Sequence, residues 1–304
     1  MFRKAVTTIA LIGILIPLWG CQNQSESQAK DVIVLGDIAL NPARKQRFQG
    51  VADYLAANLD QAGIGQGEVK IASDKETMAQ WIKAGVVDLY MDSPYPAMYM
   101  VNQTGAKVIL RRWKKGVAEY STIFFARQDS GLKSLKDLKG KMLALEVPFS
   151  SSGYMFPLSH LIKAGINPVE KREANHQVPK NQVGYVFAGD DLNTVRWVLS
   201  KNVDAGATDS ETFAGLPETQ RSQLVVLAET KKFPRQVVVA APDMDPKVLE
   251  EVKQVLIKMH KNKEGQEILQ KFKKTAKFDQ FPQEPKAALA QMEEYYELVQ
   301  GRDK

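Results

Sequence analysis

The feature that most constrains the fold is the alternation, from Asp31 onward, of short β-rich runs with stretches whose apolar residues recur at helical spacing. Residues 32–35 (Val-Ile-Val-Leu) have the composition of a buried strand, and helical spacing follows over residues 48–59. Residues 142–147 and 203–208 are further strand candidates beside helical stretches. This alternation predicts an α/β fold built around largely parallel sheets.

The length of the chain indicates two lobes, because 304 residues exceed the roughly 100 to 200 residues of one common domain. Residues 73–76 (Ser-Asp-Lys-Glu) have a capping-box pattern, which predicts the start of a helix. Beyond residue 245 the periodicity is almost entirely helical, with apolar faces that include Leu256 and Tyr296. We therefore predict two α/β lobes followed by a helical C-terminal segment.

The first 20 residues have the order of a signal peptide: two positive charges, then an apolar run. That run is broken by Thr7, Thr8 and Pro17, so it is too short for a membrane-spanning helix. It ends in Leu-Trp-Gly-Cys21, which resembles the lipobox of bacterial lipoproteins, and residues 21–30 then form a polar tether. We expect a protein on the periplasmic or cell-surface side, anchored by lipid at Cys21. An ordinary signal peptide with an unrelated cysteine is the alternative.

Composition excludes several other classes of protein. A single Cys cannot form an internal disulfide, and one Cys with three His provides few ligands for a structural metal, so we expect no metal or cofactor. The net charge of +6 is concentrated in nine lysines between residues 247 and 277. Interleaved aromatic residues are missing there, so a solvated helix face is favoured over a nucleic-acid or membrane site.

The chemistry is concentrated where the predicted strand 142–147 runs through Pro-Phe into Ser150-Ser151-Ser152-Gly153 and then into a helix from about Tyr154. A helix N-terminus with unpaired N–H groups and adjacent hydroxyls is a common oxyanion site. The alternative is a plain helix cap, because serine is favoured at that position without any ligand.

A family resemblance bears on this choice. Residues 120–141 (Tyr-Ser-Thr-Ile-Phe-Phe-Ala-Arg-Gln-Asp-Ser-Gly-Leu-Lys-Ser-Leu-Lys-Asp-Leu-Lys-Gly-Lys), followed by Ser150-Ser-Ser-Gly-Tyr154, resemble the phosphate, phosphite and phosphonate substrate-binding proteins of ABC transporters. The resemblance implies a monomer whose two lobes close on a small solute and deliver it to a membrane permease. It also implies lobe 1 at residues 31–116 and 235–304, and lobe 2 at residues 117–234.

The resemblance also assigns site residues. The family's oxyanion clamp corresponds to Ser150, Ser151 and Ser152, and its ligand-facing acid to Glu211. The family's second-lobe His corresponds to Asp191 in this sequence.

Two further positions depart from the family pattern, because Asp92 and Lys75 replace tyrosines. Acids beside an oxyanion repel it unless a cation intervenes, and Lys75, Arg235 or an amine on the ligand would supply one. We therefore expect an acidic wall opposite the serines and a zwitterionic solute such as an aminoalkyl phosphonate.

Each departure also has a simpler interpretation. Asp190 and Asp191 would cap a helix, and Asp92 would initiate a turn. Tyr95 and Tyr154 would serve either as ligand walls or as packing residues of the core or the hinge.

Two other functional classes remain open at this stage. The Ser-x-x-Lys pattern at Ser130–Lys133 is not accompanied by the partner motifs of β-lactamases, and other catalytic motifs are missing from the sequence, so we expect no enzyme. A lipoprotein that presents its ligand to a membrane sensor would need the same two lobes as a transport protein.

Overall fold

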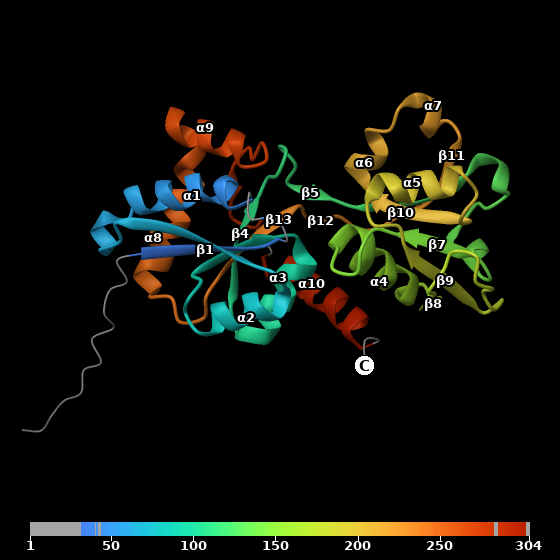
Figure 1. Cartoon of the computed structure of the whole chain (residues 1–304), viewed down its shortest axis with the longest axis horizontal. Coiled ribbons are helices and arrows are strands. Elements are labelled where there is room, and N and C mark those ends of the chain that lie inside the picture. Colours follow the sequence, from blue (N-terminus) through green and yellow to red (C-terminus); the bar gives the residue numbers. More distant parts are fainter. Residues whose placement is uncertain (1–31, 40, 42–43, 283–284, 302–304) are drawn as a thin grey trace, which may run out of the picture.

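A computed structural model describes residues 32–39, 41, 44–282 and 285–301. The predicted signal peptide, Cys21 and the predicted tether lie outside these residues. The described chain has two α/β lobes, as predicted, each built around one sheet (Figure 1). None of the helices in the described ranges combines the length and apolarity needed to cross a membrane.

Lobe 1 contains a sheet with the strand order β14-β4-β13-β3-β1-β2. Its strands are β1 (Val32–Ile38), β2 (Gln66–Ala72), β3 (Leu89–Asp92), β4 (Lys107–Arg112), β13 (Gln236–Ala240) and β14 (Phe278–Asp279). One face packs against α1 (Lys45–Ala57), α8 (Pro246–Lys258) and α9 (Lys263–Lys271), and the other against α2 (Lys75–Lys83) and α3 (Pro94–Thr104). Helices on both faces explain why these strands are apolar on both sides.

Lobe 2 repeats this design with the strand order β11-β6-β10-β7-β9-β8. Its strands are β6 (Thr122–Arg127), β7 (Met142–Leu145), β8 (Asn167–Glu170), β9 (Gln182–Phe187), β10 (Ala205–Asp209) and β11 (Leu224–Glu229). Helix α4 (Phe156–Lys163) packs on one face and α5 (Asp191–Leu199) on the other, and the short α6 (Ser210–Ala214) and α7 (Glu218–Arg221) precede β11.

The lobes are joined by two extended segments, β5 (Glu119–Tyr120) and β12 (Phe233–Pro234), which pair antiparallel with each other. We call this pair the hinge. Between them the chain forms the lobe 2 sheet, and after β12 it returns to the sheet of lobe 1 (Figure 1). The lobe limits at residues 116 and 234 remain a prediction.

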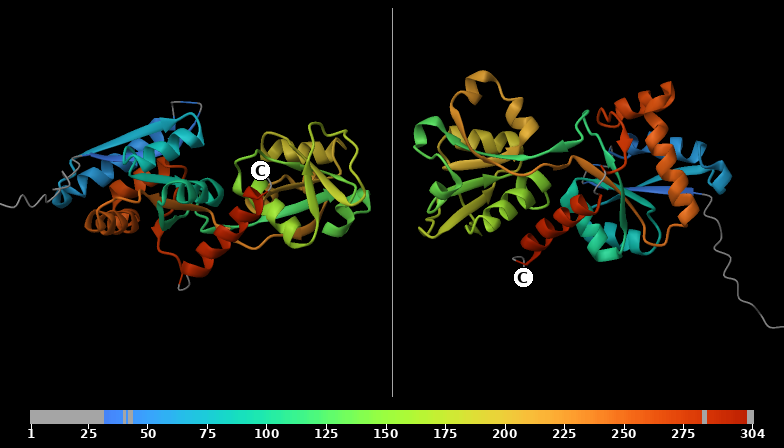
Figure 2. Two further views of the ribbon diagram at one scale, coloured as in Figure 1. Left: turned by 90° about the horizontal axis from the view of Figure 1, so that it is seen from below. Right: turned by 180° about the vertical axis from the view of Figure 1, so that it is seen from behind.

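The C-terminal helix α10 (Pro285–Gln300) lies between the lobes, as the views from below and behind also show (Figure 2). Its Tyr295 ring packs on Phe156 of α4 and Phe233 of the hinge, with ring centroids 6.4 and 4.7 Å apart. The Ser159 hydroxyl donates to the Tyr295 carbonyl at 2.9 Å, and Gln300 donates to the Tyr95 hydroxyl in lobe 1 at 2.9 Å. Helix α10 therefore contacts both lobes, although the predicted limits assign it to lobe 1.

The sheets differ from the prediction of largely parallel order. Strands β1, β2 and β3 are parallel, but β13 returns from lobe 2 and pairs antiparallel with β3 and β4. In lobe 2, β6 is antiparallel to β10 and β11, because it enters the sheet from the hinge in the opposite direction.

Some local predictions also require correction. The helix cap of α2 is Asp74, whose carboxylate accepts from the Thr77 N–H, and not Ser73. The sequence analysis missed β2, β8 and β9, and it missed β14 within a segment expected to be helical. Strand β2 contains several polar residues, and β8 and β14 are very short, so the periodicity of these three is weak. Strand β9 is a buried, mostly apolar run that the sequence analysis did not recognise.

Candidate functional site

The predicted oxyanion segment forms one turn of π-helix, η5 (Ser151–Met155), directly ahead of α4. Ser150 caps this turn, since its hydroxyl accepts from the Gly153 N–H at 3.0 Å and donates to the Glu146 carboxylate at 2.5 Å. Gly153 is required by close approach, because a Cβ there would lie 2.3 Å from the Glu146 Cβ. In this structure the first hydroxyl of the expected clamp thus bonds a carboxylate of the protein itself.

The other two serines are buried where the lobes meet. The Ser151 Oγ accepts from the Tyr95 N–H of lobe 1 at 2.8 Å, and the Ser152 carbonyl accepts from the Thr122 hydroxyl at 2.7 Å. Burial raises the pKa of the adjacent Tyr120 to about 12, and hydrogen bonding with Ser152 and Ser151 acts in the opposite direction. The segment therefore lies between the two lobes and beside the hinge.

Carboxylates of lobe 2 surround the same segment. Glu146 follows β7, Asp209 ends β10, and Asp191 begins α5 and accepts from the Thr208 hydroxyl at 2.5 Å. Burial, followed by repulsion from Glu146, raises the pKa of Asp191 to about 7. Burial also raises the pKa of Glu146. Lobe 2 therefore gathers three carboxyl groups beside this segment, and burial favours the neutral form of Glu146 and Asp191.

The sequence analysis expected Asp190 and Asp191 to cap α5, and the structure gives the two residues different roles. Asp190 is the N-cap, because its carboxylate accepts from the Asn193 N–H at 2.8 Å. Asp191 is directed instead toward Thr208, so the simple capping interpretation applies to Asp190 and not to Asp191.

Arg235 stands at the hinge between β12 and β13. Its guanidinium lies over the Tyr120 ring at 4.3 Å, and its Nε is 3.5 Å from a carboxylate oxygen of Glu211 in α6. The second Glu211 oxygen is buried and has no hydrogen-bond partner among the described residues. The structure thus brings together Arg235 and Glu211, two of the predicted site residues.

On the lobe 1 side, Asp92 ends β3 and accepts from the Tyr90 hydroxyl at 3.0 Å and from the Ser93 N–H at 2.7 Å. The second bond fits the turn interpretation of Asp92. Asp37, at the end of β1, is 1% exposed and pairs with Arg44 at 2.9 Å. Burial raises the pKa of Asp37 to about 6, although the Arg44 charge opposes that rise.

Tyr95, Tyr154 and Lys75 take part in contacts between the lobes. The buried Tyr95 ring lies 5.3 Å from Phe149 and 5.8 Å from Tyr154 between centroids, so both tyrosines pack against each other. The Lys75 ammonium lies 4.8 Å from the Tyr99 ring centroid and 5.2 Å from that of Phe149. These contacts support the packing interpretation of the tyrosines.

The acids described above are divided unequally between the two lobes. Glu146, Asp191 and Glu211 belong to the same lobe as Ser150, and Asp92 alone of the predicted acids lies in lobe 1. The β-strand ends bring them together, since β7 and β10 are parallel neighbours whose carboxyl ends meet at one edge. Sequence reasoning missed Glu146 and Asp209, although both sit at the ends of predicted strands.

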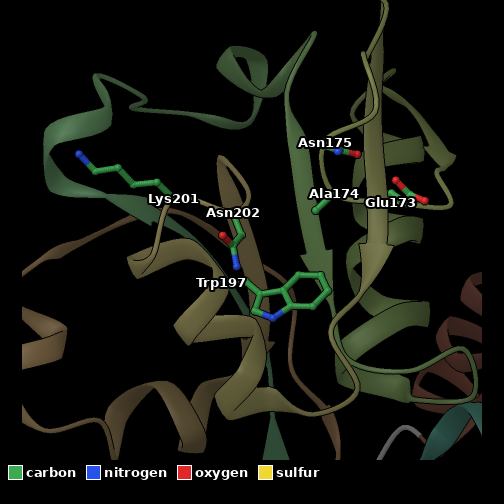
Figure 3. A pocket seen from close by; sticks show the side chains of 6 residues that line it. All are labelled: Glu173, Ala174, Asn175, Trp197, Lys201 and Asn202. Carbon is green, nitrogen blue, oxygen red and sulfur yellow. The ribbon is translucent and has the colours of Figure 1, made fainter.

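A separate pocket of about 480 Å³ opens on lobe 2 at the C-terminal end of α5, where Trp197 forms one wall (Figure 3). Asp191 lies at the opposite end of that helix, so this pocket is distinct from the Ser150 segment. Among the residues that the structure describes, no group of three or more His, Cys, Asp or Glu side chains is placed to hold a metal ion.

Comparison with known proteins identifies the family. The family described as "ABC transporter, phosphonate, periplasmic substrate-binding protein" matches residues 40–284. The phosphate-import protein PhnD of Mycolicibacterium smegmatis is 24% identical over 210 residues, which are 66% of this chain but only 64% of that relative.

Two solved structures have a similar fold. XAC2383 from Xanthomonas citri, bound to ATP, has a TM-score of 0.84 and 25% identity, covering 90% of this chain and all of that one. PhnD1 from Prochlorococcus marinus, in complex with methylphosphonate, has a TM-score of 0.61 and 21% identity, covering 89% and 98% of the two chains. Because the family match extends over most of the sequence, the chain belongs to the periplasmic substrate-binding proteins of phosphonate ABC transporters.

Proposed function

We propose that the protein captures a small solute with a phosphoryl or phosphonyl group between its lobes and delivers it to an ABC permease. The observation that carries this proposal is the position of η5, whose capped first turn lies beside the hinge and contacts Tyr95 of the other lobe. N–H groups and hydroxyls at such a turn favour an oxyanion. The named ligands of the relatives, phosphate, methylphosphonate and ATP, share this chemical group.

The acids of lobe 2 add a second requirement to the ligand. Glu146 and Asp191 lie near the serines, so a bare oxyanion would meet repulsion from them. An amine on the ligand would remove that repulsion, and Arg235 is a further cation at the hinge. We therefore infer a zwitterion, such as an aminoalkyl phosphonate, held by the Ser150–Tyr154 segment with Glu211 and Asp191 near its amine.

Calorimetric titration with phosphate, phosphite, methylphosphonate and aminoethylphosphonate tests both parts. Changing Ser150, Ser151 and Ser152 together to alanine should weaken binding at least roughly tenfold, because hydrogen bonds to charged groups contribute about 1.5 to 3 kcal/mol each. The exposed Ser200→Ala is the matched control and should leave affinity unchanged. Unimpaired binding by the triple variant rejects the clamp, and equal binding of all four solutes rejects the amine.

We further propose that Cys21 is the lipidated first residue of the mature protein and that the monomer is held on the periplasmic or cell-surface side of a membrane. The sequence supports this, because Cys21 ends an apolar run and is the only cysteine. Cys21→Ser should move the protein from the membrane to the soluble fraction after cell lysis. A membrane-bound variant, with no lipid on the unaltered protein, contradicts the anchor.

A further inference from the structure

Two lysine-bearing loops lie side by side where lobe 1 meets the hinge. The Trp113 N–H donates to the Lys277 carbonyl at 3.0 Å, and the Lys115 N–H donates to the Lys273 carbonyl at 3.3 Å. Lys115 and Lys273 both have left-handed backbones, with φ of 56° and 54°. This is an uncommon conformation for a residue other than glycine, and the paired loops hold Lys114 and Lys273 in one region.

Lys114 is half-buried, and no carboxylate in the described part of the chain lies within 4.0 Å of its ammonium. Its nearest charged neighbours are largely cations. Burial, and then repulsion from Arg235 and Lys273, lowers the pKa of Lys114 to about 7. The Lys114 ammonium also acts electrostatically on the Glu146 carboxylate of lobe 2.

Lys273 has the same kind of environment. It is half-buried, and burial, followed by repulsion from Arg44, lowers the pKa of its ammonium. The nearby carboxylates are already engaged, because Asp37 pairs with Arg44 and Asp92 accepts from Tyr90 and Ser93. The two ammonium groups thus share a partly desolvated position with an excess of positive charge, which an anion would neutralise.

A purely structural role does not account for this arrangement. Arg112, the buried cation beside them, has its polar groups satisfied by Thr275, Gln236 and the Phe272 carbonyl at 2.9, 2.6 and 3.0 Å. Lys114 and Lys273 have no comparable set of protein acceptors among the described residues.

We propose that Lys114 and Lys273 form an anion subsite of lobe 1, which receives a second anionic group of the solute. This inference rests on the proposed function, in which the Ser150 segment holds the first anionic group. The substrate class is then a small zwitterion that carries, besides the amine proposed above, two anionic groups: a phosphoryl or phosphonyl group and either a second phosphoryl group or a carboxylate. A solute with one anionic group would leave the two lysines without a counterion.

The test compares probes with one and two anionic groups on the full chain. Titrations use methylphosphonate, pyrophosphate and phosphonoacetate, and the last two distinguish a second phosphoryl group from a carboxylate. The double variant Lys114→Gln with Lys273→Gln should lower the affinity for the preferred two-anion probe at least tenfold. Its affinity for methylphosphonate should fall less than threefold. Lys115→Gln with Lys274→Gln is the matched control, because these exposed lysines occupy the same loops with left-handed backbones. It should change neither affinity.

A second readout is proton uptake. An anion beside Lys114 raises its affinity for a proton, so titration at pH 8 in buffers of different ionisation enthalpy should show uptake on binding of the preferred two-anion probe. Lys114→Gln should reduce that uptake relative to the unaltered protein, and Lys115→Gln should not. Unchanged uptake in Lys114→Gln contradicts the subsite.

The remaining outcomes separate this proposal from the proposed function. If methylphosphonate binds and neither two-anion probe binds, or if the double lysine variant weakens all probes equally, the subsite is overturned and the proposed function stands. If aminoethylphosphonate binds to the unaltered protein and none of the three probes does, the subsite is overturned and the proposed function stands. If aminoethylphosphonate does not bind either, both are overturned. Thermal unfolding of each variant confirms that it is folded before it is titrated.

Discussion

The two lobes meet the hinge with opposite charge. Lobe 2 contributes Glu146, Asp191 and Asp209, whereas lobe 1 contributes Lys114 and Lys273. The lobe 1 acids Asp37 and Asp92 are bound by Arg44 and by Tyr90 and Ser93. Each surface contains like charges that repel one another, and each therefore destabilises its own lobe. The comparison teaches that a solute carrying both an amine and anionic groups would relieve both repulsions at once. We therefore expect charge to couple ligand binding to closure of the lobes.

The largest expected effect separates a structural cation of lobe 1 from a binding one. Arg112→Met should lower the free energy of unfolding by about 3 kcal/mol, because it leaves a buried carbonyl and a buried amide oxygen without their donor. Lys114→Met should leave the free energy of unfolding unchanged or raise it, because a desolvated charge is removed. Urea denaturation at pH 7 measures both.

Equal destabilisation by Arg112→Met and Lys114→Met would break this distinction. It would mean that Lys114 stabilises the fold. The opposite charges of the two lobes would then not support a binding role for Lys114.

An intermediate effect concerns the acidic surface of lobe 2. The pKa of Asp191 is raised to about 7, so the unfolded chain releases its proton at lower pH than the folded protein does. Ionisation of Asp191 therefore lowers the free energy of unfolding. This loss is absent below about pH 4 and complete above about pH 7. Asp191→Asn should therefore raise the free energy of unfolding by about 2 kcal/mol at pH 8 and little at pH 4.5.

The neighbouring cap provides the control for that measurement. Asp190→Asn preserves an N-cap side chain on α5 and should leave the pH dependence of stability intact. A pH dependence that is equally steep in Asp191→Asn and the unaltered protein would place the titrating carboxyl elsewhere.

The smallest expected effect concerns Lys75, a lysine of lobe 1 outside the proposed subsite. Its ammonium interacts with Tyr99 and with Phe149 of lobe 2, a contact that contributes about 0.5 to 1 kcal/mol at an exposed position. Lys75→Gln should lower the affinity for all solutes equally, by about two- to fivefold, because it weakens the contact between the lobes. Selective loss of one solute in calorimetry would instead make Lys75 a ligand group.

The sequence predicted the two-lobe α/β fold because the strands ahead of buried helices, such as β1 and β13, are strongly apolar. It did not predict which strands run antiparallel, since strand direction depends on the return of the chain through the hinge. Strands β8 and β14 were missed because four and two residues carry almost no periodicity.

The candidate site was predictable only where a local pattern existed. The serines before α4 have such a pattern, and η5 does begin there. The relation of Glu146 to Ser150 and the loop pairing that positions Lys114 depend on tertiary contacts between distant segments. The spacing of residues along the chain does not reveal those contacts. The opposite charges of the two lobes could therefore not be predicted from the sequence.

The position of α10 has a consequence for the order in which the protein matures. Its residues 285–300 follow both lobes along the chain, and they dock on α3 of lobe 1 as well as on α4 of lobe 2. Each lobe can begin to collapse as its own residues emerge, but the surface that receives α10 exists only when both are present. Helix α10 therefore docks after both lobes have formed, and a variant truncated before residue 285 would lack this contact between them.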